Sequence, residues 1–188
     1  LLISIVITII FILIFFYSYQ TYNDKKKEQI SERYNNAIIE YNKKNNSKTQ
    51  LIMKEIIEDE DTTYSPLALY FLIDNDLIEN RKDANKFFDI LINKTSLDKE
   101  IKNLIIYKKA LYNADILDEN ELIQILKPVL NSESIWKSHS LYLVAEYFYS
   151  KNEIQKSKDF FYQIINTENA NLDIIKEAQK RLNRDLSE

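Results

Sequence analysis

The sequence predicts an all-α protein in which one apolar N-terminal helix is followed by a series of antiparallel helix hairpins. Three observations lead to this prediction. The 188 residues include no glycine and only two prolines, Pro66 and Pro128, so turns that need a positive φ and backbone loops that cradle phosphates are poorly supported. Apolar residues recur at helical spacing in short blocks separated by polar gaps. A spacing of small and bulky residues also repeats along the chain.

The overall charge and the cysteine count exclude several classes of function. The net charge is −4, and no basic stripe stands out, so nucleic acid is not expected as the main partner. The chain has no cysteine, which excludes disulfides and thiolate metal sites and leaves the redox compartment open.

The first element is the uncharged segment LLISIVITIIFILIFFY at residues 1–17. In a helix it would rise about 26 Å, slightly less than the hydrocarbon core of a bilayer. Tyr17, Tyr19 and Tyr22 follow where an interfacial aromatic belt would lie. We therefore predict a transmembrane anchor at residues 1–22. A cleaved signal peptide is the main alternative, but no small-x-small cleavage site follows, and a core helix apolar on all sides would need protein all around it.

The remaining elements are helices joined by short turns. A juxtamembrane helix at 23–46 is expected to lead into a first, degenerate repeat, and a repeat domain is expected at 47–188. The apolar blocks place helices at 26–44, 48–59, 65–75, 81–93, 98–113, 119–131, 136–150, 153–166 and 170–185. Short turns favour antiparallel neighbours, so consecutive helices should form hairpins.

The repeat is visible in the spacing of small and bulky residues. Ala145 is followed 12 residues later by Ser157 and 4 residues after that by Phe161. The copies start at Leu72, Ala110 and Ala145, with a weaker one at Tyr41, so the interval runs from 31 to 38 residues. Tetratricopeptide repeats (TPRs) have an interval of about 34 residues, and the sequence therefore predicts a TPR-like α-solenoid. The predicted repeat-packing residues are Leu72, Ala84, Phe88, Ala110, Leu122, Leu126, Trp136, Ala145, Ser157 and Phe161.

The last predicted helix is a cap. It places Leu172, Ile175, Ala178 and Leu182 on one face and charges on the other, which is what the free end of a solenoid requires. Residues next to the core positions of the inner helices should line a concave groove. The predicted groove residues for a protein partner are Ile73, Tyr107, Tyr142, Glu146 and Tyr149.

Residues with possible chemistry have simpler structural interpretations. His139 is the only histidine and lacks partners for a triad or a zinc site. The acidic run EDEDTT at 58–63 lacks the glycine and ligand spacing of a calcium loop, so an acidic inter-helix turn is favoured. The carboxylates at 118–121 fit a helix N-terminus. Trp136 can anchor a partner or pack under a neighbouring hairpin, and packing is favoured. We predict no catalytic residue, cofactor, metal or small-molecule substrate.

The segment LKPVLNSESIWKSHSLYLVAEYFYSKNEIQKSKDFFYQIINTENANLDIIKEAQKRL, residues 126–182, resembles the TPR-like domain of the ancillary subunit of the SecYEG translocon, which is grouped with a periplasmic cell-division coordinator. The likeness lies in a Leu-x-Pro segment, a tryptophan that opens the next helix, a small residue inside that helix and a Lys-x-x-x-x-Phe second helix. The family's turn glycine is absent, and Ser150, Lys151 and Asn152 stand in its place. Asn152 would have to adopt the left-handed conformation.

The resemblance implies a single-pass protein of the bacterial inner membrane with its soluble domain in the periplasm. Its partners would be translocon subunits, periplasmic chaperones or secreted clients. Lys25, Lys26 and Lys27 follow the apolar segment, and by the positive-inside rule they alone would place the domain in the cytoplasm. Here we follow the resemblance. A membrane-anchored protein-binding scaffold is the first hypothesis, a structural spacer or cell-division coordinating factor of the envelope is the alternative, and an enzyme is not expected.

Overall fold

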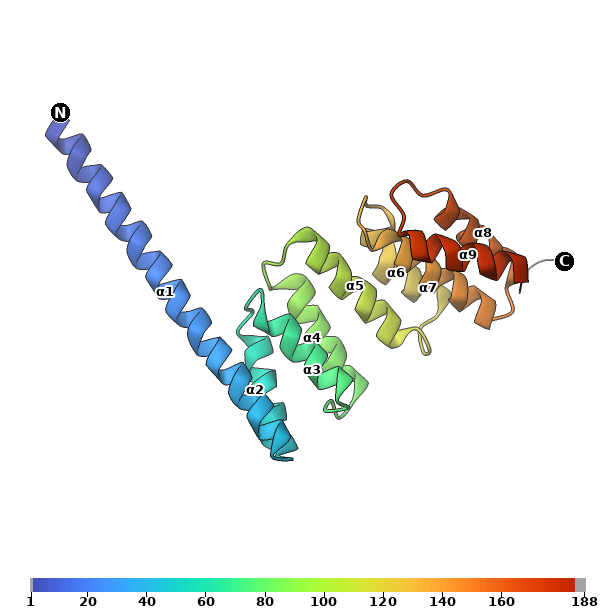
Figure 1. Cartoon of the computed structure of the whole chain (residues 1–188), viewed down its shortest axis with the longest axis horizontal. Coiled ribbons are helices and arrows are strands. Elements are labelled where there is room, and N and C mark those ends of the chain that lie inside the picture. Colours follow the sequence, from blue (N-terminus) through green and yellow to red (C-terminus); the bar gives the residue numbers. More distant parts are fainter. Residues whose placement is uncertain (1, 185–188) are drawn as a thin grey trace. The chain divides into compact units, whose positions relative to one another are not determined.

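The computed structural model describes residues 2–184, and it describes side chains from residue 9 onward. Within this part of the chain every regular element is an α-helix (Figure 1). The helices are α1 (Leu2–Asn42), α2 (Asn46–Glu58), α3 (Tyr64–Asp74), α4 (Arg81–Asn93), α5 (Lys99–Asn113), α6 (Glu119–Leu130), α7 (Lys137–Ser150), α8 (Ile154–Ile165) and α9 (Leu172–Arg184). The predicted all-α class is confirmed, and the bounds of α2 to α9 agree with the predicted ranges to within two residues.

The N-terminal helix differs from its prediction. Helix α1 runs without a break through the predicted boundary between the anchor at 1–22 and the juxtamembrane helix at 23–46. No helix in the described part of the chain combines the length and the apolarity needed to cross a membrane. The predicted transmembrane anchor is therefore not supported. Of the apolar run, this finding covers residues 9–16, which are followed by polar residues such as Gln20, Asn23 and Asp24. The part of the prediction that concerns the side chains of residues 1–8 lies outside the described residues.

The chain divides into two compact units, and the predicted repeat domain at 47–188 extends over both. The first unit comprises the residues up to Ile90 together with 94–96, and the second comprises 91–93 and the residues from Leu97 onward. In the first unit α1 packs against α2 and α2 against α3, and in the second unit each helix from α5 to α9 packs against the next one along the chain. This arrangement is consistent with an α-solenoid.

In the first unit the C-terminal half of α1 packs against α2 and α3. Ala37 of α1 is completely buried, and the hydroxyl of Thr49 on α2 donates to its carbonyl oxygen at 3.3 Å. The hydroxyl of Ser65, at the start of α3, donates to the Ile56 carbonyl at 2.6 Å. Small residues with internally satisfied hydroxyls allow the helix backbones to approach closely.

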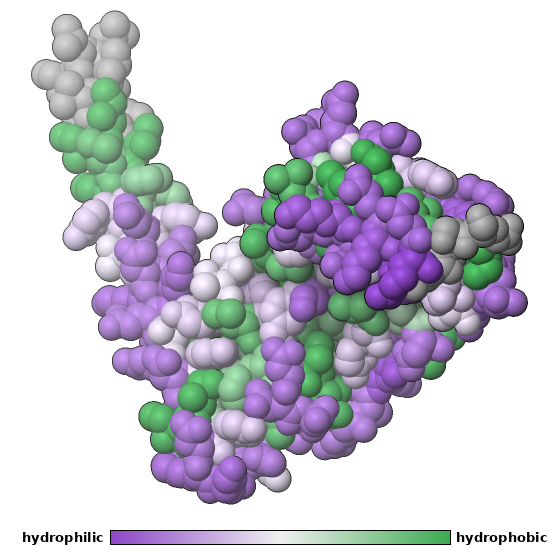
Figure 2. Space-filling model, turned by 45° about the vertical axis from the view of Figure 1, so that its right-hand side comes forward, coloured by the Kyte–Doolittle hydropathy of each residue, from purple (hydrophilic) through white to green (hydrophobic). Residues whose placement is uncertain are grey.

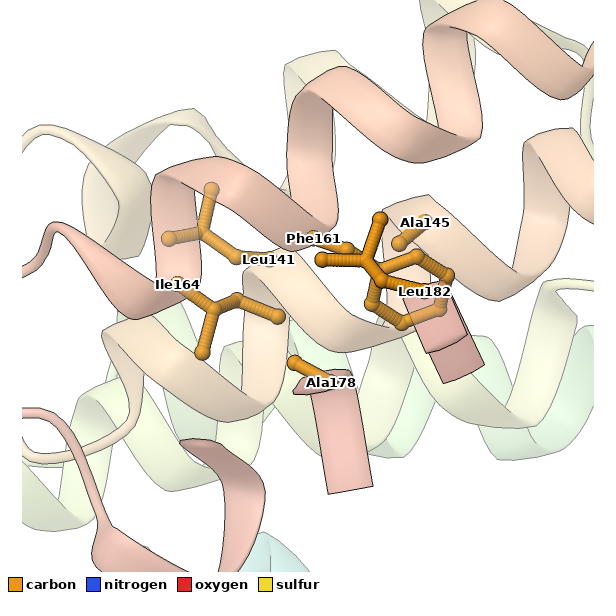
Figure 3. Packing of buried hydrophobic residues seen from close by; sticks show 6 residues of the cluster. All are labelled: Leu141, Ala145, Phe161, Ile164, Ala178 and Leu182. Carbon is orange, nitrogen blue, oxygen red and sulfur yellow. The ribbon is translucent and has the colours of Figure 1, made fainter. Parts of the chain in front are cut away.

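In the second unit the hairpins α5–α6 and α7–α8 are followed by α9, which packs on both α7 and α8. Ala145 and Ser157, which the repeat spacing placed opposite each other, are both completely buried. Figure 3 shows Phe161 near Ala145 of α7 and Leu182 of α9, in a cluster whose members are Leu141, Ala145, Phe161, Ile164, Ala178 and Leu182. A small residue on α7 leaves room for the Phe161 ring, and α9 covers the other side of the cluster.

The turns between the helices contain no glycine, and other residues adopt the left-handed backbone conformation there. Five residues of the described chain adopt a positive φ, namely Lys44, Glu60, Asp76, Asn152 and Asn169. This conformation costs a non-glycine residue about 1–2 kcal/mol, and Asn and Asp tolerate it best. Asn152 has a φ of 61° at the α7–α8 turn, as the sequence required in the place of the missing glycine. The backbone N–H of Glu153 then donates to the Phe148 carbonyl at 2.9 Å and closes the turn.

Candidate functional site

Helix α7 carries His139, the only histidine, and three predicted groove residues, Tyr142, Glu146 and Tyr149. Its start is fixed by the preceding loop. The Glu100 carboxylate, in the first turn of α5, accepts hydrogen bonds from the Ser134 hydroxyl at 2.7 Å and from the Ile135 backbone N–H at 3.2 Å. The Ser134 hydroxyl oxygen accepts in turn from the Trp136 N–H at 3.1 Å. These contacts hold Trp136 as the cap residue of α7.

An aromatic cluster forms where α7 begins. The rings of Trp136 and Tyr107 stack with their centroids 5.9 Å apart and their planes 19° apart. The His139 ring lies 5.1 Å from Trp136 and 5.9 Å from Tyr107. Burial lowers the pKa of His139, and the nearby Ile135 backbone partly opposes this effect. The imidazole is therefore neutral near pH 7. The structure thus brings Tyr107, a predicted groove residue, against Trp136, a predicted packing residue.

A cleft of about 430 Å³ opens beside this cluster. Its walls are Ile135, Trp136 and His139 from the start of α7, and Asn169 and Asn171 from the α8–α9 loop. The Asn171 backbone N–H donates to the buried Ser138 hydroxyl at 3.3 Å, which ties that loop to α7. The Ile135 backbone N–H donates to Glu100, which fixes the position of this residue at the rim of the cleft. The residue is still 63% exposed. A preformed apolar cleft with a few amide groups is suited to bind an extended peptide or a small side chain.

The three predicted groove residues of α7 lie next to the last helix, α9. Arg181 of α9 binds the Glu146 carboxylate through two hydrogen bonds of 2.7 and 2.8 Å. The same guanidinium lies over the Tyr149 ring, with its central carbon 4.2 Å from the centroid. Tyr142 packs edge-on against Phe161 at 5.5 Å. Burial, aided by the nearby Glu146 charge, raises the pKa of the Tyr142 hydroxyl to about 12. Tyr142, Glu146 and Tyr149 therefore face a helix of their own chain.

Ile73 is the fifth predicted groove residue. It lies half-buried on α3 in the first unit, whereas Tyr107 and the residues of α7 belong to the second unit. Of the predicted repeat-packing residues, Trp136 is half-buried and the others are at most 1% exposed.

The acidic side chains at 58–63 and 118–121 form ion pairs or accept hydrogen bonds at helix ends. In the run at 58–63, Asp59 pairs with Arg33 and Glu58 with Lys86. Asp61 accepts from the backbone N–H groups of Thr63 and Tyr64 at 2.9 and 2.7 Å. Asp118 and Glu121 form a reciprocal capping box at the start of α6. In the described part of the chain no group of three or more metal-binding side chains converges.

Sequence reasoning missed the contacts that arise over long separations. The sequence placed Arg181 on the charged face of the last helix, yet its side chain binds Glu146, 35 residues away. Asn169 and Asn171 were not singled out in the sequence, and they reach the cleft because the α8–α9 loop lies against the start of α7. No local pattern could reveal either contact.

The fold and this surface define a class: an all-helical chain built as stacked hairpins, with an aromatic cleft at the start of α7. Comparison with known proteins does not narrow the class, because no family model, curated protein or solved structure matches the chain.

Proposed function

We propose that this protein is a helical-repeat scaffold that binds other proteins at a membrane of the bacterial envelope, as an ancillary factor of the Sec translocon. The observation that carries the protein-binding part is the cleft beside Trp136. An aromatic pair that is already stacked loses little side-chain freedom when it binds a partner, and aromatic anchors dominate the energetics of many interfaces. The membrane part is supported by the exposed apolar side chains of α1. The partners would be translocon subunits, periplasmic chaperones or secreted clients, and the soluble units would lie in the periplasm.

A photocrosslinking experiment tests the protein-binding part. A photoreactive amino acid replaces Ile135 at the rim of the cleft in the full chain, and purified translocon in membranes or an unfolded secreted protein is offered as the partner. We expect crosslinks that are lost in a Trp136→Ala background. The matched control places the same group at Leu51, which is 58% exposed on α2. Equal crosslinking from both positions would contradict a specific cleft.

Sidedness has a separate test. A reporter that is active only outside the cytoplasm is fused after Glu188, and activity is expected. An inactive fusion whose cytoplasmic counterpart is active would remove the periplasmic location.

The second candidate is a spacer of the envelope, and the length of α1 favours it. This helix has 41 residues, which correspond to about 60 Å. Only its C-terminal part packs against α2 and α3. A spacer predicts that Trp136→Ala leaves function intact in the cell, whereas a deletion of whole turns from residues 18–27 impairs it. A binding scaffold predicts a loss with Trp136→Ala.

A further inference from the structure

The described start of α1 exposes apolar side chains around its whole circumference. Eight consecutive residues, from Ile9 to Phe16, are between 49% and 75% exposed. Successive residues of a helix are rotated by about 100°, so this stretch has no polar face. A protein partner would cover one stripe of such a helix, whereas a helix that is apolar on all sides needs an apolar medium on all sides. Lipid chains meet this need.

Along α1 the side chains then change from apolar to aromatic to charged. The regions of a bilayer follow the same order from the hydrocarbon core to the headgroups. The apolar stretch ends at Phe16, and the exposed phenols of Tyr17, Tyr19 and Tyr22 follow within about two turns. Lys25, Lys26 and Lys27 come next and are all exposed. Figure 2 shows the same change on this arm, from hydrophobic residues to hydrophilic ones. Hydrocarbon, interface and headgroup region follow one another in this order in a membrane.

A shallow hollow of about 350 Å³ lies at the boundary. Tyr17, Ser18, Thr21, Tyr22 and Lys25 line it, so hydroxyl groups and one ammonium share a surface. The Thr21 hydroxyl already donates to the Tyr17 carbonyl at 2.9 Å. The Cα–Cβ bonds of a helix tilt toward its N-terminus, so the Lys25 side chain leans toward the tyrosines and the apolar end. Ser18, Tyr22 and Lys25 supply the donors that a phosphate group requires.

The charges around the hollow are arranged unevenly. Asp24 and Glu28 are four residues apart and therefore share one face of the helix. The three lysines between them occupy the remaining directions. In the described part of the chain Lys25, Lys26 and Lys27 form no ion pair, whereas lysines of the packed helices, such as Lys156, do. Unpaired ammonium groups beside an apolar helix end are attracted to anionic lipid headgroups.

We propose that the segment of α1 from Tyr17 to Lys27 is an interfacial site for anionic phospholipids, in which the hollow beside Lys25 holds the lipid phosphate. This inference rests on the proposed membrane location and adds a lipid preference to it. The apolar residues provide binding to any bilayer, and the lysines select negatively charged ones.

The test measures binding of the full chain to two kinds of vesicle, one of phosphatidylcholine alone and one in which part of it is replaced by phosphatidylglycerol. We expect binding to both, with roughly tenfold higher affinity for the anionic vesicles, and we expect added salt to remove most of this difference. The triple variant K25Q/K26Q/K27Q should bind both kinds of vesicle about equally. The control triple K82Q/K127Q/K176Q removes the same charge from exposed lysines of α4, α6 and α9, and it should keep the preference.

The outcomes separate the two proposals. Equal affinity of the parent protein for both vesicles would overturn the lipid preference and leave the membrane location standing. A parent protein that binds neither vesicle would overturn both. A preference that survives K25Q/K26Q/K27Q would show that the charges responsible lie elsewhere, and it would overturn the site.

Two single variants test the hollow itself. If it holds the phosphate, Lys25→Gln should weaken binding to anionic vesicles more than Lys26→Gln does, because only Lys25 lines the hollow. Equal losses would indicate diffuse attraction and would exclude the hollow as the binding site.

Discussion

Helices α1 and α7 are both rich in large apolar residues, but only one of them is surrounded by its own protein. Helix α7 contacts α5, α6, α8 and α9, and Leu141, Val144, Ala145 and Phe148 on it are at most 3% exposed. The described side chains of α1 before Ile30 are exposed, apart from the half-buried Thr21, and Phe15 is 75% exposed. The comparison teaches that apolar composition alone does not define a core. A core also needs neighbours that complete the enclosure, and the described start of α1 instead exposes its apolar side chains.

Hydrogen exchange of the full chain in water should show the largest difference between the two helices. Amides of residues 9–27 should exchange with almost no protection, because an isolated helix is marginal in water. Amides of α7 should exchange only when the whole second unit unfolds, and this unfolding requires a free energy of several kcal/mol. Addition of anionic vesicles should raise the protection of residues 9–27 and leave that of α7 unchanged. Strong protection of residues 9–27 in water alone would mean that the chain encloses this segment itself.

The core beside α7 can be opened by one substitution. Phe161→Ala should lower the free energy of unfolding of the second unit by about 3–5 kcal/mol, because the ring is completely buried between α7, α8 and α9. Tyr162→Ala is the matched control, since Tyr162 is 54% exposed on the same helix, and it should change stability by less than about 0.5 kcal/mol. Urea denaturation followed by the fluorescence of Trp136, the only tryptophan, reports on this unit. Similar losses for both variants would contradict the packing described for α8.

The contact between α7 and α9 should have a smaller effect. The side chains of Arg181 and Glu146 are 14% and 32% exposed, so water screens their attraction only in part. A double-mutant cycle with Arg181→Gln and Glu146→Gln should give a coupling energy of about 1 kcal/mol. Urea denaturation of the four proteins measures it. Additive effects of the two substitutions would mean that the ion pair does not help to hold α9 on α7.

His139 should contribute the smallest effect, seen as a dependence of stability on pH. Burial lowers the pKa of His139 in the folded protein, so the unfolded chain binds the proton more tightly. The stability that depends on the neutral imidazole is complete above the unfolded pKa of about 6.5. It is lost as the pH falls from there through the folded pKa. His139→Asn should reduce the loss of stability between pH 7.5 and 5.5 by less than about 1 kcal/mol, as measured by urea denaturation at both values. An unchanged pH dependence would assign it to the carboxylates.

Helix positions could be predicted well because they depend on local patterns. The absence of glycine, the apolar spacing of 3 and 4 residues and the turn residues near Asn152 are all present in short windows of sequence. The repeat spacing of Ala145, Ser157 and Phe161 also placed these residues at a common interface, since a crossing of two helices constrains which side chains can face each other. The predicted anchor stays a prediction for residues 1–8, because their side chains lie outside the described part of the chain.

The sequence by itself determined an all-α chain, the bounds of its helices and the pairing of small with bulky residues along the hairpins. Only the tertiary structure decided that Arg181 lies against Glu146 and Tyr149, that Trp136 stacks on Tyr107 beside an open cleft, and that the described side chains at the start of α1 are exposed. The physical reason is range. Helical hydrogen bonds and periodicity act over three or four residues, whereas the surfaces that remain free for a partner or a lipid depend on contacts between segments about 30 residues apart or more.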